Sequence, residues 1–464
     1  MVTERHFPPE AVIHLNLPVF VFSTAVAVAT GIVFGISPAF HFSTPRLDEL
    51  MRAASHRATA GSQSRRMRDL LVASQVALTV LLLAGAGSAM RSFVNVYRTK
   101  LGYDPHNVLT VGISLPDGNY TTYETRAAFY RGIHKHVATL PGITSAAVAL
   151  FSLPPVEDVR QTLEIMGRTP EKGQTVNVQE TTGEYFSTLE ISLLKGRVWS
   201  EAENNRAAHV AVINEEMARR FWPNRDAIGQ RIRFPELIAF TSWTLATTDS
   251  NGWLEIVGVA GNTPNRGLRE PVAPAAYVPY TLVMGDSMQL VIRTVSDPMG
   301  MVRAVRQQIH SVDPGQPVAK TQTAEDLLRA EGWAREQFVA SLFLVFAMLA
   351  LALAATGLYS VVAYATALRT REFGIRMALG AQKTHVIGLV LSSAVKTVSA
   401  GIVVGAALGS AGNGLIGRWV SGSVYDPVML GVIAALLFSA TGLAAYVPAR
   451  RAATCDPMQV LRTE

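Results

Sequence analysis

The sequence is poor in cysteine and in charged residues. Cys455 is the only cysteine among 464 residues, so no intrachain disulfide can form and any folded domain must be held by an ordinary apolar core. Only 16% of the residues are charged, whereas 49% are hydrophobic and the mean hydropathy is +0.24. This balance argues against an ordinary soluble protein and favours insertion into a membrane.

Motifs for enzymatic chemistry are also missing. The sequence has no G-x-x-x-x-G-K-[ST] loop, so an ATP motor acting with this chain is expected on another polypeptide. His134 and His136 are two positions apart in a helical stretch, which points their side chains in different directions and disfavours joint metal binding. No spacing selects an acid and base pair among Glu180, Glu184, Glu215 and Glu216. We therefore predict no catalytic, cofactor or metal site, and no enzymatic activity.

Long apolar runs are abundant instead. Five stretches approach the roughly 20 apolar residues that a helix needs to cross the hydrocarbon of a bilayer. They are Leu17–Ala39, Leu70–Met90, Phe338–Tyr364, Val386–Leu408 and Val428–Tyr446. In the fourth stretch, small residues recur every four positions at Gly401, Gly405 and Gly409. This pattern either allows close helix packing or reflects the general frequency of glycine in membrane helices.

Basic residues gather in three short segments beside these stretches. The segments carry Arg46, Arg52, Arg57, Arg65, Arg66 and Arg68; Arg369, Arg371, Arg376 and Lys383; and Arg450, Arg451 and Arg462. The positive-inside rule places all three in the cytoplasm and the long insert between the second and third stretches outside it. The net charge of +6 is therefore a signal of membrane topology, and we expect contact with the lipid bilayer and none with nucleic acid.

Two local features allow alternatives. Residues 1–40 could be a cleaved signal peptide, but their flank is weakly basic and no A-x-A-like site ends them. Lys396 lies inside the fourth apolar stretch, where an ionisable residue is either functional or close enough to the cytoplasmic surface for its stem to reach water.

The insert, residues 92–336, is predicted to be a soluble α+β domain. Strand-like Asn107–Ser114, helical Tyr120–Leu140 and strand-like Ile143–Leu150 open it. A second strand, helix and strand close it, at Gln289–Val295, Met299–Val312 and Val318–Thr321. This repetition favours a split ferredoxin-like arrangement, with roughly residues 155–285 inserted as a strand-rich subdomain.

Several longer motifs resemble one known family. They are RTREFGIRMALGA at Arg369–Ala381, PARRAATCDPMQVLRTE at Pro448–Glu464, GRVWSEAENNRAAHVAVINEEMARRFWPNRDAIGQRIRF at Gly196–Phe234, and IVGVAGN at Ile256–Asn262. Together they are similar to the MacB/FtsX-like permeases of ABC-type complexes. The resemblance implies a multi-pass protein of the bacterial inner membrane with its large domain in the periplasm, no cofactor of its own, and an ATP-binding partner subunit.

One departure from the family pattern concerns the start of the chain. A family unit has one helix, the periplasmic domain and then three helices, whereas this sequence has an extra apolar stretch before them. We therefore expect the C-terminal half of a tandem permease, assembled with a second permease half or as a homodimer, with a further periplasmic partner as an open option. The predicted parts are residues 1–40, a first transmembrane helix; 41–69, a cytoplasmic linker; 70–91, a second helix; 92–336, a MacB-like periplasmic core domain; and 337–464, an FtsX-like permease domain with three helices.

The resemblance also assigns a coupling loop that docks on the ATP-binding subunit. Its residues are Arg369, Arg371, Glu372, Phe373, Gly374, Arg376, Met377, Gly380 and Lys383. Their charges suit ionic contacts and their apolar members suit a groove, although a basic helix lying on anionic lipid has the same composition. Arg450 and Arg451 fit either a contact with the cytoplasmic partner or simple anchoring of the last helix.

Three functions follow as hypotheses. The first is a permease that exports or extracts an amphiphilic substrate, with Met90–Tyr97 and Glu325–Phe338 transmitting movement to the periplasmic domain. The second is an FtsX-like transducer that regulates a periplasmic cell-wall hydrolase. The size of the insert argues against it, because that branch of the family has a small extracellular loop. The third is a membrane-anchored periplasmic enzyme, which no motif in the sequence supports.

Overall fold

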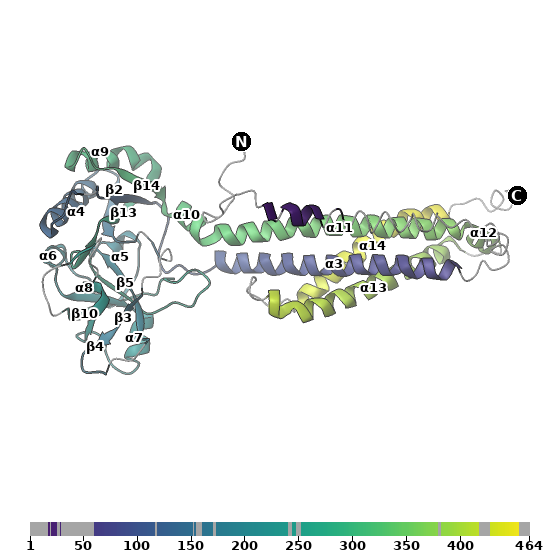
Figure 1. Ribbon diagram of the computed structural model, residues 1–464, viewed down its shortest axis with the longest axis horizontal. Helices are drawn as coiled ribbons and strands as arrows, with labels where there is room; N and C mark the ends of the chain where they lie inside the picture. The colour runs from purple at the N-terminus through teal and green to yellow at the C-terminus, as the bar shows by residue number, and fades with distance from the viewer. Residues whose placement is uncertain are drawn as a thin grey trace. The chain divides into compact units, whose positions relative to one another are not determined.

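The computed structural model describes most of the chain in two compact units. The described residues are 17–18, 20–25, 28, 60–116, 118–151, 153–154, 160–169, 173–239, 244–246, 252–378, 382–416 and 427–453. One unit comprises Met1–Val94 with Glu336–Glu464, and the other comprises Asn95–Arg335 (Figure 1). We call them the membrane unit and the periplasmic unit and describe each by itself.

The membrane unit consists of helices. They are α3 (Ala60–Tyr97), α11 (Ala334–Leu368), α12 (Thr370–Ala378), α13 (Lys383–Ile416) and α14 (Pro427–Ala453). Within the described residues, four of them are long and apolar enough to cross a membrane, with mean hydropathies from 1.9 to 2.6. The predicted helical membrane domain is thereby confirmed for its second to fifth spans. The first predicted span, Leu17–Ala39, lies mostly outside the described residues and stays a prediction.

Small and β-branched side chains hold this bundle together. One face of α3 presents Val72, Val76 and Val80, which are buried against α11, α13 and α14. The hydroxyl of Thr79 donates to the carbonyl of Ala350 on α11 at 3.3 Å, so these two helices lie side by side. In a membrane such close packing replaces the hydrophobic effect as the force between helices.

Two glycines of α13, Gly401 and Gly405, lie against α3. A β-carbon added to Gly401 would lie 2.7 Å from Cβ of Val76, and one added to Gly405 would lie 2.8 Å from the carbonyl oxygen of Ala77. Gly409 is buried on the same helix. The geometry supports the proposal that Gly401 and Gly405 are kept small for helix packing, and for Gly409 this role stays a prediction.

Replacing Gly405 with alanine is expected to destabilise the bundle by about 1–3 kcal/mol, because the added methyl overlaps the α3 backbone. The matched control is Gly388→Ala on the same helix, where the added β-carbon meets nothing within 4 Å. That change should be neutral or stabilise by up to about 1 kcal/mol through helix propensity. Thermal unfolding of both variants in detergent measures the difference, and equal midpoints would contradict the packing role of Gly405.

The periplasmic unit is built on one mixed sheet. Among the described residues the sheet has the order β14-β1-β13-β2-β5-β11-β7-β10-β8-β4, with β3 paired to β5 and β6 paired to β10. The strands are β1 (Val108–Ser114), β2 (Ile143–Ala149), β3 (Arg160–Thr162), β4 (Glu164–Ile165), β5 (Thr175–Thr181), β6 (Leu193–Gly196), β7 (Val210–Asn214), β8 (Arg231–Arg233), β10 (Leu254–Ala260), β11 (Ala275–Pro279), β13 (Ser287–Thr294) and β14 (Val318–Thr323). A second, two-stranded sheet pairs β9 (Thr244–Ala246) with β12 (Val283–Gly285).

The first four strands of that order form a ferredoxin-like half. Strands β1, β2, β13 and β14 are all antiparallel to their neighbours, in the spatial order fourth, first, third, second. Helices α4 (Tyr123–Ala138) and α9 (Val302–Val312) pack on one face of them over a core that includes Ile133 and Ile309 (Figure 1). The predicted β-α-β unit at each end of the insert is confirmed.

The inserted part extends the same sheet. Short helices α5 (Tyr185–Thr188), α6 (Glu201–Asn205), α7 (Glu215–Phe221) and α8 (Pro235–Ala239) accompany its strands. Asn214 ends β7 and caps α7, because its side-chain oxygen accepts from the amides of Met217 and Ala275. Two further cores, around Ile213 and around Phe186, fill the sides of this part of the sheet.

Candidate coupling site

Helix α12 is a short helix anchored to α13 by its apolar side. Phe373 is buried against Val386 of α13, and Met377 packs against the same contact. Ile375 is 51% exposed. On the surface, Arg376 Nη2 lies 2.5 Å from Oε1 of Glu372, one turn away, in an exposed ion pair. The helix is therefore held from beneath while its charged side stays accessible.

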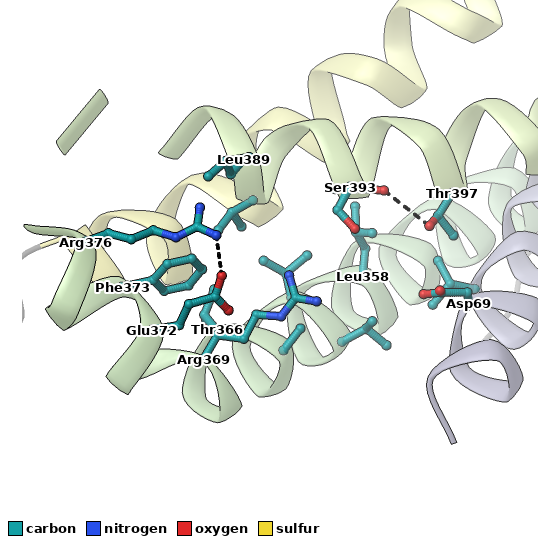
Figure 2. A pocket seen from close by; sticks show the side chains of 16 residues that line it. Asp69, Leu358, Thr366, Arg369, Glu372, Phe373, Arg376, Leu389, Ser393 and Thr397 are labelled. Carbon is teal, nitrogen blue, oxygen red and sulfur yellow. Dashed lines mark hydrogen bonds and ion pairs between the residues drawn. The ribbon is translucent and has the colours of Figure 1, made fainter. Parts of the chain in front are cut away.

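A cavity of about 330 Å³ lies beside α12 in the membrane unit (Figure 2). Its wall is formed by α3, α11, α12 and α13, which contribute Asp69, Val72, Leu358, Val361, Val362, Ala365, Thr366, Arg369, Glu372, Phe373, Arg376, Leu389, Val390, Ser393, Ala394 and Thr397. The polar members form two groups, with Thr366, Arg369, Glu372 and Arg376 where α11 passes into α12, and Asp69, Ser393 and Thr397 away from them (Figure 2). The rest of the wall is apolar.

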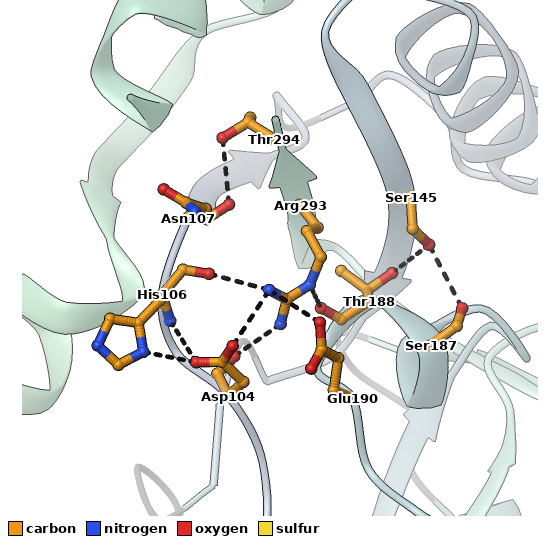
Figure 3. Close-up of polar contacts among 9 residues, drawn as sticks. All are labelled: Asp104, His106, Asn107, Ser145, Ser187, Thr188, Glu190, Arg293 and Thr294. Carbon is orange, nitrogen blue, oxygen red and sulfur yellow. Dashed lines mark hydrogen bonds and ion pairs between the residues drawn. The ribbon is translucent and has the colours of Figure 1, made fainter. Parts of the chain in front are cut away.

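A second polar cluster lies in the periplasmic unit around Arg293 (Figure 3). The guanidinium of this β13 residue donates to the carbonyls of Thr188 at 2.7 Å, His106 at 3.0 Å and Asp104 at 2.8 Å. It also lies 3.6 Å from the Asp104 carboxylate and 3.4 Å from that of Glu190. One side chain thus joins the loop before β1 to α5 and β13.

His106 connects this cluster to the segment that leaves the periplasmic unit. Its Nδ1 lies 2.6 Å from Oδ1 of Asp104, and its Nε2 lies 3.3 Å from Oε1 of Glu325 in α10 (Ala324–Leu327). The hydrogen bond and charge of Asp104 raise the pKa of His106 above its ordinary value. Burial alone would raise the pKa of Asp104, but hydrogen bonds from His106 and the charge of Arg293 lower it. The raised pKa keeps His106 protonated, and so able to attract the Glu325 carboxylate, at higher pH than an unperturbed histidine would be.

The two chain segments that border the periplasmic unit meet in an apolar contact. Val96, at the end of α3, packs with Leu268 and Leu328. The rings of Tyr97 and Trp333 lie 5.0 Å apart between centroids. Leu328–Trp333 is a π-helical segment between α10 and α11, and π-helical turns are frequent where helices serve a function.

Comparison with known proteins decides the family. A model of the MacB-like periplasmic core domain matches residues 70–325, more than half of the chain, and a model of the FtsX-like permease C-terminal domain matches residues 344–457. The chain belongs to the MacB/FtsX-like family of ABC transporter permeases. It is accordingly a multi-pass protein of the inner membrane whose Asn95–Arg335 unit is periplasmic.

Individual relatives share less than 30% sequence identity with this chain. The permease is 28% identical over 277 residues to the macrolide export ATP-binding/permease protein MacB of Nitrosomonas europaea, covering 58% of this chain and 40% of that protein. It is 27% identical over 283 residues to the pyoverdine export ATP-binding/permease protein PvdT of Pseudomonas syringae pv. tomato, covering 58% and 40%. The crystal structure of the periplasmic region of MacB from Actinobacillus actinomycetemcomitans covers 50% of this chain and 96% of its own, with 13% identity and a TM-score of 0.32. The chain spans less than half the length of the two curated relatives.

The structure places most of the predicted coupling residues of this permease together. Arg369, Glu372, Phe373 and Arg376 line the cavity, and Met377 packs beneath α12. Arg371 and Gly374 lie within α12, and Lys383 is the exposed first residue of α13. Arg450 and Arg451 lie in the last turn of α14. Gly380 lies outside the described residues.

Sequence reasoning missed the part of the cavity that comes from other helices. Asp69 precedes the second apolar stretch, and Ser393 and Thr397 are one turn apart inside the fourth. A search for polar side chains at helical spacing within apolar stretches could have found the last two. Nothing in the sequence indicated that Asp69 lies across from them.

Proposed function

We propose that this permease couples ATP hydrolysis by an ATP-binding subunit to movement of its periplasmic unit, and that this movement exports or extracts an amphiphilic substrate. Membership of the ABC permease family implies an ATP-binding partner. The finer steps, which are docking through α12 and transmission through the long helices, are our inference from the geometry.

The observation that carries the proposal is that α12 is packed against α13 on one side and exposed on the other. Phe373 fixes the helix to α13, and the exposed Glu372, Ile375 and Arg376 offer two opposite charges and an apolar contact to a partner. Only Arg369 stands between α12 and α11, a helix of 35 residues. A push on α12 would therefore be passed to α11 with little loss in a flexible loop.

The proposal that the substrate is amphiphilic rests on the small number of polar side chains in the described membrane helices. In the described membrane helices, polar side chains outside the cavity near α12, such as Gln75, Thr79 and Lys396, are few beside the apolar residues. A row of such side chains along the bilayer would be expected for a polar solute pathway. A substrate that is handled from the periplasmic side of the bilayer fits these helices better.

The test exchanges the charges of the α12 ion pair. The double change Glu372→Lys with Arg376→Glu keeps an attractive pair one turn apart, so α12 should remain folded, but it reverses the charges shown to a partner. We expect stimulation of the ATPase to fall at least about tenfold, because juxtaposed like charges cost several kcal/mol at an interface. ATP hydrolysis is measured with the ATP-binding subunit that co-purifies with the full-length permease in mild detergent.

The matched control makes the same two replacements at exposed residues of the periplasmic unit, Glu201→Lys with Arg303→Glu. This control should leave the stimulation unchanged. Stimulation of wild-type size in the α12 double variant would show that another segment makes the contact. Failure to recover any ATP-binding subunit with the permease would remove the proposal altogether.

A second function is supported by the match of residues 344–457 to the FtsX-like permease domain. In that reading the periplasmic unit binds and activates a cell-wall hydrolase, and no solute moves. Both readings use the same coupling at α12. Substrate efflux from vesicles distinguishes them, because the transducer requires ATP-dependent hydrolase activation without efflux.

A further inference from the structure

The cavity beside α12 contains charges that do not neutralise one another within it. Glu372 and Arg376 are paired with each other at 2.5 Å. Arg369 and Asp69 remain, and neither forms an ion pair with another described residue. Figure 2 shows their side chains extending from opposite sides of the cavity, Arg369 from the α12 side and Asp69 from α3. Among the described residues that line it, the cavity thus offers one cation and one anion without an ion-pair partner, at separate places.

A hydroxyl group of the cavity adds an acceptor beside these charges. Thr397 donates its proton to the carbonyl of Ser393 at 3.3 Å. Its hydroxyl oxygen keeps lone pairs for a donor in the cavity. A ligand with N–H donors is better matched to this oxygen than one with acceptors alone.

The remaining wall is apolar and belongs to the spans. Val72, Leu358, Val362 and Val390 come from three helices that cross the bilayer, and Leu389 at the same cavity is 40% exposed. Hydrocarbon chains of a neighbouring lipid can therefore reach the wall from the membrane. A nucleotide or an inorganic phosphate would leave this wall uncovered and would bring several negative charges close to Asp69 and Glu372.

We propose that the cavity binds a zwitterionic phospholipid with a primary ammonium group, of the phosphatidylethanolamine class. Arg369 holds the phosphodiester, Asp69 receives the ammonium, and the acyl chains cover the apolar wall. Arginine suits the phosphate because its guanidinium presents several donors in one plane. The ammonium distinguishes this lipid from an anionic phosphatidylglycerol, which has no cation for Asp69, and from phosphatidylcholine, whose quaternary ammonium has no N–H donor.

The experiment measures lipids retained by the full-length permease. Protein in detergent is exchanged with equal amounts of phosphatidylethanolamine, phosphatidylglycerol and phosphatidylcholine, and bound lipid is quantified by native mass spectrometry. We expect the wild type to retain the ethanolamine lipid about fivefold over the glycerol lipid, and Asp69→Asn to lose this preference, as one partly exposed ion pair predicts. Arg369→Gln should lower retention of all three lipids.

Lys396→Gln is the matched control, because Lys396 is an exposed cation of α13 that does not line the cavity. It should retain lipid as the wild type does. Should Asp69→Asn fail to fold, Ser393→Leu fills the side of the cavity where Asp69 lies, from another helix, and should reduce retention of the ethanolamine lipid as well. Thermal unfolding of each variant checks its fold.

Two results would overturn the proposal. Equal retention of all three lipids by the wild type would mean nonselective contact with the bilayer. Displacement of the lipid by millimolar inorganic phosphate would indicate a site for phosphate anions in place of a lipid. Binding is measured without an ATP-binding subunit, so either failure leaves the proposed docking of α12 untouched.

Discussion

Replacing Arg293 with alanine is expected to lower the free energy of unfolding of the periplasmic unit by about 3–5 kcal/mol. The Arg293 side chain is only 10% exposed and donates to three backbone carbonyls, two in the loop before β1 and one in α5. Alanine leaves these carbonyls and the carboxylate of Asp104 without their cation, and it opens space in the cluster. Loss of a buried partner is costly because the remaining polar groups stay desolvated.

Two variants sharpen this test. Arg293→Lys keeps the charge but lacks the planar set of donors, so it should recover only part of the lost stability. Arg303→Ala removes an exposed arginine of α9 and should change stability by less than about 0.5 kcal/mol. Urea unfolding of the full-length permease in detergent, followed by the fluorescence of the buried Trp199 and Trp222, measures all three. A loss below 1 kcal/mol for Arg293→Ala would mean that the cluster does not hold these segments together.

Replacing Glu180 with glutamine is expected to stabilise the periplasmic unit at neutral and alkaline pH. Glu180 on β5 is 3% exposed, and its Oε2 has no hydrogen-bond partner among the described residues. Burial raises its pKa from 4.5 to about 8. The unfolded chain releases the proton near pH 4.5, whereas the folded protein keeps it, so folding binds a proton between these values.

The sign of the pH dependence follows from this proton. Between about pH 4.5 and 8, the free energy of unfolding contributed by Glu180 falls as pH rises, by about 4–5 kcal/mol in total. Glutamine cannot ionise, so Glu180→Gln should remove this slope and raise stability at pH 8 by about 3 kcal/mol, less than the full amount because its amide is also buried. Urea unfolding at pH 5 and pH 8 measures it, with Glu201→Gln at an exposed position as control. Parallel slopes for wild type and Glu180→Gln would show that Glu180 is ionised in the folded protein.

The sequence predicted the parts of the fold that depend on local pattern. Apolar runs such as Phe338–Tyr364 indicate membrane helices because an unpaired backbone in hydrocarbon is too costly for any other single segment. The two β-α-β units could be predicted because α4 and α9 have apolar residues at helical spacing and lie between strands with β-branched residues. For Arg369–Lys383, composition fitted both a loop that docks on a partner and a basic helix on anionic lipid, and the docking role implied by the family likeness stays a prediction.

The remaining features depend on contacts between distant residues. The order of β5, β11, β7 and β10 is set by pairings that no short window contains. Arg293 looked like any polar residue of a strand, because its three acceptors are backbone carbonyls and carry no residue signature. No pattern in the sequence indicated that Glu180 is buried, since the burial of a single carboxylate is decided by tertiary packing.

The neighbouring positions of β1 and β14 in the sheet have a consequence for how such permeases can diversify. Chain entry and exit of the periplasmic unit are adjacent, with Val96 near Leu328 and the rings of Tyr97 and Trp333 in contact. A block whose two ends meet can be cut out and exchanged for another by joining only those ends. Recombination at this one junction would replace the whole periplasmic unit and leave the membrane helices unchanged.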